Sequence, residues 1–216
     1  TVAGIVAFPS ILKAKDTQKK IVTGVIGLSR GMGHAVKYLE ASNCEVAYLC
    51  DVDSRRIAGG MNRAKASLKD FPQAKDPQGI TDFRRILDDK SIDAVSIAAP
   101  NFWHTPMAIL AMEAGKHVYV EKPASHVFAE GRRLIESAKK ANRILQHGTQ
   151  MRSSEVTMKA DEVLKSGLLG DIKLSRAWSI EPRLHPPPVL NEEPPAGLDY
   201  CVFGYFPNFE GNFRDF

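Results

Sequence analysis

The chain has 216 residues, of which 44% are hydrophobic and 25% charged, and its formal net charge is +4 at pH 7. This balance is typical of a globular protein and excludes a chain that is mainly disordered or fibrous. The three cysteines lack metal-ligand spacing and are too few for a disulfide framework, so neither a zinc site nor a disulfide-rich scaffold is expected. Lysines and arginines occur in scattered pairs, and no apolar run reaches 18 residues, so neither a nucleic-acid partner nor a membrane span is expected.

The N-terminal segment TVAGIVAFPSIL, residues 1–12, is apolar and rich in small residues. Two interpretations of residues 1–19 stay open: the remnant of an export signal whose basic region is missing, or an N-terminal arm. The first places the protein in the periplasm or outside the cell, and the second in the cytoplasm.

From residue 20 to about 150, short apolar runs alternate with segments of helical period. Strands that alternate with helices imply right-handed crossovers and a mostly parallel sheet covered on both faces. The predicted fold class is therefore α/β, with a Rossmann-type doubly wound parallel sheet over residues 20–150. Strands are expected at 21–26, 46–50, 94–99, 117–120 and 144–146, and helices at 34–42, 54–71, 82–88, 105–114 and 127–142.

Past residue 150 the pattern changes. A helix is expected over 156–165 and a strand over 172–180, and seven of the 13 prolines follow residue 180. Proline lacks the N–H donor that an inner strand needs, so this last part is predicted to be a long loop. Residues 151–216 are therefore expected to begin an incomplete α+β substrate domain, with the chain apparently truncated.

The strongest local motif is the segment Gly27-Leu28-Ser29-Arg30-Gly31-Met32-Gly33. It follows a predicted strand and opens a predicted helix, where glycines permit a tight turn and a close approach of a pyrophosphate to the backbone. The strict Gly-x-Gly-x-x-Gly spacing is not met, because Ser29 takes the second glycine position and Met32 the third. Alternatively, Gly31 and Gly33 serve after a shortened turn. We expect the residues from Gly27 to Met32 to bind a dinucleotide.

Asp51 lies at the end of the second predicted strand, 24 residues after Gly27. At that position a carboxylate can accept hydrogen bonds from the adenosine ribose hydroxyls. The same charge would repel a 2′-phosphate, which favours NAD over NADP as the cofactor. Arg55 and Arg56 weaken this argument, since either one could reach such a phosphate.

A second group of polar residues follows the fourth and fifth predicted strands. Ala99, Asn101 and His104 come after the fourth, and Glu121 and Lys122 come at the end of the fifth. The carboxyl ends of parallel strands are where open α/β sheets bind their ligands. Taken singly, His104 could be an ordinary residue at a helix start and Lys122 a solvated loop residue. Their joint placement at one edge of the sheet favours a functional site.

Three runs of this sequence together resemble the Gfo/Idh/MocA oxidoreductase family. They are 92–104, 112–123 and 144–152, and the second contains Glu-Lys-Pro, the most specific short signature of that family. The resemblance covers about residues 21–180. It implies an NAD(P)-binding Rossmann domain followed by a domain whose open, mostly antiparallel sheet forms the substrate face.

The resemblance also implies roles for individual residues. Lys122 is expected to be catalytic, beside the nicotinamide and the reacting hydroxyl, while Glu121, Asn101 and His104 are expected to line the cofactor cleft. The implied activity is NAD-dependent hydride transfer at a secondary hydroxyl of a sugar, polyol or sugar derivative. The implied partners are that small molecule and a second copy of the chain, paired through the C-terminal sheet.

Two alternatives remain beside the dehydrogenase. One is an NAD-dependent glycosidase of the same fold, a branch in which the lysine is replaced, so the intact Lys122 favours the dehydrogenase. The other is a truncated nucleotide-binding module without turnover, because the catalytic histidine of the family's second domain has no counterpart in this sequence.

Overall fold

A computed structural model describes residues 20–69, 75–178, 194–199 and 202, and the structural statements below concern these residues. The strands form one sheet in the order β3-β2-β1-β4-β5-β6, and every neighbouring pair is parallel. The order reverses between β1 and β4, which is the arrangement of a Rossmann fold and confirms the predicted fold class. The strands are β1 (Ile21–Ile26), β2 (Cys44–Cys50), β3 (Gln78–Ile80), β4 (Ala94–Ile97), β5 (His117–Glu121) and β6 (Leu145–Gly148).

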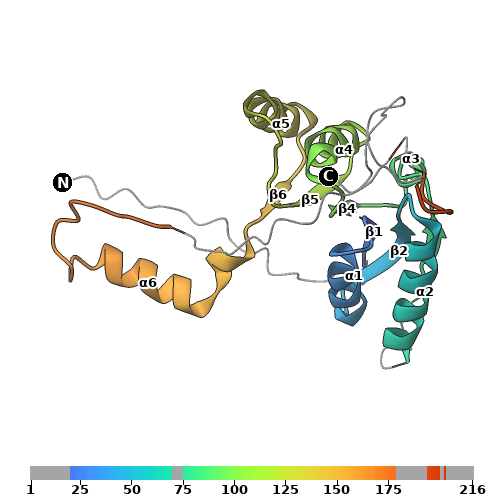
Figure 1. Cartoon of the computed structure of the whole chain (residues 1–216), viewed down its shortest axis with the longest axis horizontal. Coiled ribbons are helices and arrows are strands. Elements are labelled where there is room, and N and C mark those ends of the chain that lie inside the picture. The colour runs from blue at the N-terminus through green and yellow to red at the C-terminus, as the bar shows by residue number, and fades with distance from the viewer. Residues whose placement is uncertain (1–19, 70–74, 179–193, 200–201, 203–216) are drawn as a thin grey trace.

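Helices cover both faces of the sheet. They are α1 (Gly31–Glu40), α2 (Ser54–Leu68), α3 (Arg84–Asp88), α4 (Asn101–Glu113) and α5 (Phe128–Ala141). In Figure 1, α1 and α2 lie on one side of the strands, and α4 and α5 lie on the other. Successive residues of a strand point to opposite faces, so Val25 packs with α1 and α2 while Ile26 packs with the core under α4. Each such fully buried aliphatic side chain contributes about 1.5 to 3 kcal/mol.

Several elements of the Rossmann part differ in their bounds from the sequence-based expectation; α1, for example, begins at Gly31 rather than at residue 34 and ends at Glu40 rather than at residue 42. The largest differences are at β3 and α4. The three-residue strand β3 was not predicted, because so short a segment shows no periodicity. Helix α4 begins at Asn101 rather than at residue 105, and Pro106 lies inside the helix instead of starting it. Since Pro100 precedes the first helical residue, α4 follows β4 almost directly, and its first turn reaches the carboxyl edge of the sheet.

Beyond the sheet, a 3₁₀ turn (Gln150–Ser153) leads into α6 (Glu155–Lys165), which confirms the last predicted helix. The strand expected over 172–180 is wrong for residues 172–178, which have no regular structure, and residues 179–180 lie outside the described part. A strand needs a neighbour for its backbone hydrogen bonds, and α6 with the residues after it extends away from the sheet (Figure 1). Apolar side chains there stay exposed, Trp178 by 75%.

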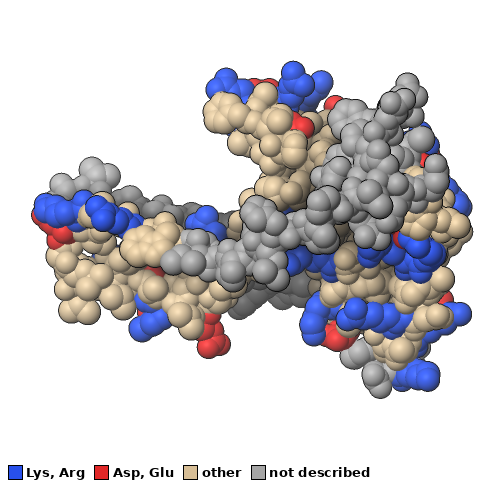
Figure 2. Space-filling view, in the orientation of Figure 1, with Lys and Arg blue, Asp and Glu red and all other residues tan. Residues whose placement is uncertain are grey.

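On the face shown in Figure 2, lysines and arginines form several separate groups, over α5, over α6 and over the region of α1 and α2. Within the described residues, no helix is both long and apolar enough to cross a membrane. Residues 1–19 lie outside the described part, so both interpretations of that segment stay predictions.

Candidate functional site

A cavity of about 360 Å³ opens at the carboxyl edge of the sheet, where the strand order reverses. This is the position at which open α/β sheets bind ligands. Most of the predicted site residues line it, whereas Leu28, Gly31 and Met32 do not. Those that line it are Gly27, Ser29, Arg30, Asp51, Ala99, Asn101, His104, Glu121 and Lys122.

Gly27 makes the turn after β1 and occupies the left-handed region with φ +88°. A Cβ atom at this position would lie 2.4 Å from the carbonyl oxygen of Ala98, which follows β4. The Gly27 N–H donates to the Cys50 carbonyl oxygen at 2.8 Å, so the ends of β1, β2 and β4 meet at this turn. Only glycine satisfies both the conformation and the close approach.

The other glycines of the motif have different roles. A Cβ atom on Gly31, the first residue of α1, would lie 3.0 Å from Val25 Cγ1, so this glycine allows α1 to pack closely on the sheet. A Cβ atom on Gly33 would meet nothing within 4 Å. Packing therefore requires glycine at position 27, favours it at position 31 and does not need it at position 33. The side chains of Leu28 and Met32 are buried in the core between α1 and α2, and they support the turn from beneath.

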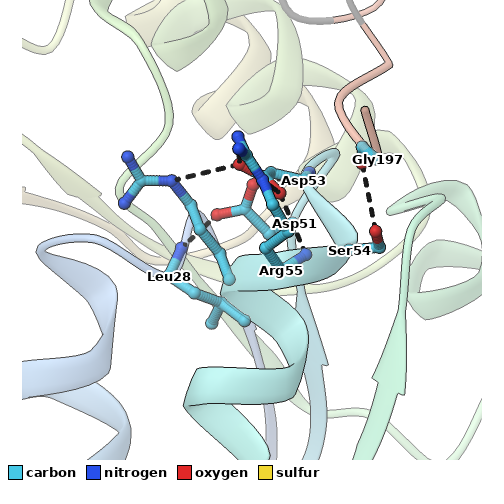
Figure 3. Close-up of polar contacts among 7 residues, drawn as sticks. Leu28, Asp51, Asp53, Ser54, Arg55 and Gly197 are labelled. Atoms are coloured by element: carbon cyan, nitrogen blue, oxygen red, sulfur yellow. Dashed lines mark hydrogen bonds and ion pairs between the residues drawn. The ribbon is translucent and has the colours of Figure 1, made fainter. Parts of the chain in front are cut away.

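The carboxylate of Asp51 lies at the cavity end of β2 and is fixed by two backbone donors. Its Oδ2 accepts from the Leu28 N–H at 2.7 Å and its Oδ1 from the Asp53 N–H at 3.0 Å (Figure 3). A carboxylate has about four acceptor sites, so each oxygen can still accept another hydrogen bond. The glycine-rich turn and Asp51 thus form one connected unit.

Asp53 caps α2, and its carboxylate pairs with both of the arginines that follow it, more loosely with Arg56, whose Nε lies 3.9 Å from the Asp53 Oδ2. Its Oδ1 accepts from the Arg55 N–H at 2.9 Å, and its carboxylate binds the Arg55 guanidinium through Nε at 2.9 Å and Nη2 at 2.6 Å (Figure 3). The hydrogen bonds from Arg55 keep the pKa of Asp53 below its ordinary value. Arg56 lines the cavity, and Arg55 does not.

His104 is buried with 1% exposure in the first turn of α4. Its Nδ1 lies 2.6 Å from the Pro123 carbonyl oxygen and its Nε2 lies 2.8 Å from that of Ala99. The next residue, Thr105, donates from its hydroxyl to the Ala124 carbonyl oxygen at 2.9 Å. His104 therefore borders the cavity as predicted, while its ring nitrogens contact the loops that follow β4 and β5.

Glu121 is buried at the end of β5 and joins three elements. Its Oε1 lies 3.1 Å from His34 Nε2 on α1, and its Oε2 accepts from the Lys122 N–H at 3.2 Å. His34 Nδ1 in turn lies 3.0 Å from the Ser96 hydroxyl on β4. His34 was not among the residues predicted from the sequence; the available signal was its position in the first turn of α1, three residues after Gly31.

Lys122 follows directly on Glu121 and is exposed at the cavity rim. Asp51 follows β2 and Lys122 follows β5, so three inter-strand spacings, roughly 14 Å, separate the two strand ends. One cavity therefore presents a fixed carboxylate at one end and an ammonium group at the other.

The cavity wall also contains residues, most of them apolar, that were not predicted from the sequence. The rings of Phe83 and Trp103 pack edge to face with centroids 6.1 Å apart. Burial, with a further contribution from the Asp51 and Asp82 charges, raises the pKa of the Cys50 thiol to about 12. The unpredicted wall residues include Cys50, Thr81, Phe83, Trp103, Met107 and Val202.

Comparison with known families agrees with this geometry. The Gfo/Idh/MocA description, an oxidoreductase family with an NAD-binding Rossmann fold, matches residues 21–149, which are more than half of the chain. The chain belongs to the Gfo/Idh/MocA oxidoreductase family. The matched region begins with β1 and ends just after β6.

Individual relatives in this family are distant. A glycosyl hydrolase family 109 protein of Saccharopolyspora erythraea is 31% identical over 166 residues, 74% of this chain and 35% of that protein. A myo-inositol 2-dehydrogenase of Thermotoga maritima is 31% identical over 167 residues, 77% of this chain and 46% of that protein. The crystal structure of myo-inositol 2-dehydrogenase from Lactobacillus plantarum has a TM-score of 0.59 at 26% identity, covering 71% of this chain and 43% of that one. The chain thus spans less than half the length of these relatives.

The residues at the cavity fit the dinucleotide that the Gfo/Idh/MocA family description names. Gly27 leaves its backbone accessible where a side chain cannot be accommodated, and α1 begins just after the turn, so its positive N-terminal end faces the cavity. Asp51 is oriented by two donors and keeps acceptor capacity. The turn at Gly27 with the start of α1 suits a pyrophosphate. The oriented Asp51 carboxylate suits the hydroxyls of a ribose.

Proposed function

We propose that this chain is the cofactor-binding part of an NAD-dependent dehydrogenase that acts on a secondary hydroxyl of a sugar, polyol or sugar derivative. The observation that carries the proposal is the single cavity that holds Asp51 at the end of β2 and Lys122 at the end of β5. The inositol dehydrogenases among the relatives support a polyol or sugar as the substrate class.

In this proposal the residues of β1 and β2 bind the cofactor. The pyrophosphate lies against the turn from Gly27 to Gly31, and the ribose hydroxyls of the adenosine donate to Asp51. The Asp53 carboxylate pairs with the guanidinium groups of Arg55 and Arg56 and so competes with a 2′-phosphate for them, while Asp51 repels such a phosphate. The preferred cofactor is therefore NAD rather than NADP.

Lys122 acts at the other end of the cavity. NAD+ supplies the hydride acceptor when bound. The hydroxyl proton of the substrate passes to a base, a role that the family resemblance gives to a histidine of the second domain. The Lys122 ammonium donates a hydrogen bond to the substrate oxygen and stabilises the alkoxide that this proton transfer leaves. The charge of the alkoxide then forms the carbonyl bond as the hydride leaves the carbon. The Lys122 backbone is oriented by the buried Glu121 carboxylate, and the loop that follows it contacts His104.

Calorimetric titration of NAD and NADP tests this assignment. We expect the wild type to bind NAD more tightly than NADP, and Asp51→Ala to weaken NAD binding by about 1 to 3 kcal/mol, the cost of losing a partner for polar groups. Asp76→Ala, which removes an exposed carboxylate outside the cavity, serves as the control and should bind like the wild type. Equal NAD affinity in wild type and Asp51→Ala, or tighter NADP binding, would contradict the proposal.

A glycosidase of the same fold is the second candidate, favoured by the similarity to the glycosyl hydrolase family 109 protein. The two activities differ in their net use of cofactor. A dehydrogenase accumulates NADH in proportion to product, whereas a glycosidase that oxidises and then reduces its substrate releases a leaving group without net NADH. Lys122, which the glycosidase branch replaces, favours the dehydrogenase.

A further inference from the structure

A segment far from the Rossmann core in sequence lies against the cofactor cavity. It consists of residues 194–199 and Val202, and we name it the crossing segment. It contacts the loop after β2 through an antiparallel bridge between Asp53 and Leu198. In this bridge the Ser54 N–H donates to the Gly197 carbonyl oxygen at 2.9 Å, and the Asp199 N–H donates to that of Val52 at 3.0 Å.

A turn within the crossing segment fits it closely against α2. The Leu198 N–H donates to the Pro195 carbonyl oxygen at 3.1 Å, and Gly197 has φ +92°. The Ser54 hydroxyl, at the start of α2, donates to the Gly197 carbonyl oxygen at 3.2 Å (Figure 3). A Cβ atom on Gly197 would lie 2.6 Å from this hydroxyl oxygen, so the contact requires glycine.

The other end of the crossing segment binds the opposite wall of the cavity. Trp103 on α4 donates from its indole nitrogen to the Val202 carbonyl oxygen at 2.8 Å. Asp199 accepts from the Val202 N–H at 3.1 Å and so fixes Val202 relative to the bridge. Val202 and Trp103 both line the cavity. The crossing segment therefore connects the β2 side of the cavity with the α4 side.

We propose that the crossing segment is a third wall of the cofactor site and retains the adenosine half of NAD. This proposal rests on the proposed function, which places the adenosine ribose at Asp51. The bridge lies within three residues of Asp51, and the opposite contact is made by Trp103. A ligand held between these two walls leaves slowly while the segment is in contact with both, so the segment acts mainly on the dissociation rate.

Two substitutions detach the crossing segment at different points. Gly197→Ala forces a Cβ atom against the Ser54 hydroxyl and disfavours the φ of the turn. Trp103→Phe removes the indole donor to Val202 and keeps an aromatic ring beside Phe83. Gly170→Ala is the matched control, because Gly170 also has a positive φ, +65°, while a Cβ atom there would meet nothing within 4 Å.

The test is the NADH dissociation rate, measured by mixing NADH-loaded full chain with excess NAD+ and following NADH fluorescence. We expect Gly197→Ala and Trp103→Phe each to raise this rate about fivefold, the change equivalent to one hydrogen bond, and Gly170→Ala to match the wild type. ADP-ribose, which lacks nicotinamide, should lose affinity in the first two variants by a similar factor.

The outcomes separate this proposal from the proposed function. If the wild type binds NADH and all three variants release it at the wild-type rate, the crossing segment is not a wall of the site, although the cofactor assignment holds. An effect on NADH without one on ADP-ribose would also overturn the placement over the adenosine half. A wild type that binds neither ligand would overturn the cofactor assignment and this proposal with it.

Discussion

Cys50 illustrates how the position of one residue at the cavity determines its chemistry. The side chain is 2% exposed, and burial with the nearby carboxylates raises the pKa of the thiol to about 12. The reactive form of cysteine is the thiolate, so Cys50 is expected to be inert although it borders the cavity. At pH 8, iodoacetamide should leave Cys50 unmodified in the folded chain and alkylate it after unfolding in urea, as read by peptide mass mapping. Equal rates in the two states would show that the thiol is accessible and ionised.

Single residues were predictable where position along the chain determines the role. Asp51 directly follows β2 and Lys122 directly follows β5, and the carboxyl ends of parallel strands meet at one edge of the sheet, so both were predicted to lie at that edge, where both line the cavity. His34 and Trp103 were not, because what each does depends on a partner distant in sequence. His34 contacts Glu121, and Trp103 contacts Val202. No local pattern in the sequence encodes such a pair.

Two glycines at the junction of β1 and α1 should respond very differently to substitution by alanine. Gly27→Ala places a Cβ atom 2.4 Å from the Ala98 carbonyl oxygen at a positive φ, so it should lower thermal stability and weaken NAD binding at least tenfold. Gly33→Ala adds a methyl group into open space inside α1, where alanine is favoured by up to about 1 kcal/mol. Thermal melts and NAD titrations of the two variants measure both effects. Similar losses of stability and NAD affinity in Gly27→Ala and Gly33→Ala would contradict the close approach of Gly27 to the Ala98 backbone.

The start of α2 predicts a pH dependence of stability. Because the folded-state pKa of Asp53 lies below the unfolded value, its contribution is complete above the unfolded pKa, about 3.9, and is lost as the pH falls through the folded value. Asp53→Asn keeps a good helix cap but cannot titrate. Urea unfolding should show a smaller loss of stability between pH 5 and pH 3 in Asp53→Asn than in the wild type. The same loss in both proteins would contradict this.

The elements predicted well from the sequence are those in which regularly spaced apolar residues extend over several positions and end at a residue that terminates a helix or strand. β1 has the predicted bounds, and α5 and β5 match within one residue at each end. β3 has three residues, and its strand state comes from pairing with β2. Residues 172–178 show the opposite case, since their strand-like composition has no partner strand in the described part of the chain.

At the scale of the whole molecule, the right-handed crossover rule and the strand pattern were enough to predict a parallel, doubly wound sheet. The placement of the crossing segment was not predictable, because it depends on contacts with Val52, Ser54 and Trp103 that lie about 100 residues or more away in sequence. Beyond the Rossmann part, the apolar side chains of Ile172, Leu174 and Trp178 are exposed, because no other described element packs on them.

Hydrogen–deuterium exchange of the chain with and without NAD is the decisive test of an NAD site at the carboxyl edge of the sheet, because it locates the ligand on the fold. With NAD bound we expect slower exchange in the segments at the cavity, residues 27–31, 51–54 and 99–104, and unchanged exchange in α6, which lies away from it. Protection that is absent from these three segments, or that is as strong in α6, would contradict an NAD site at the switch point of the sheet.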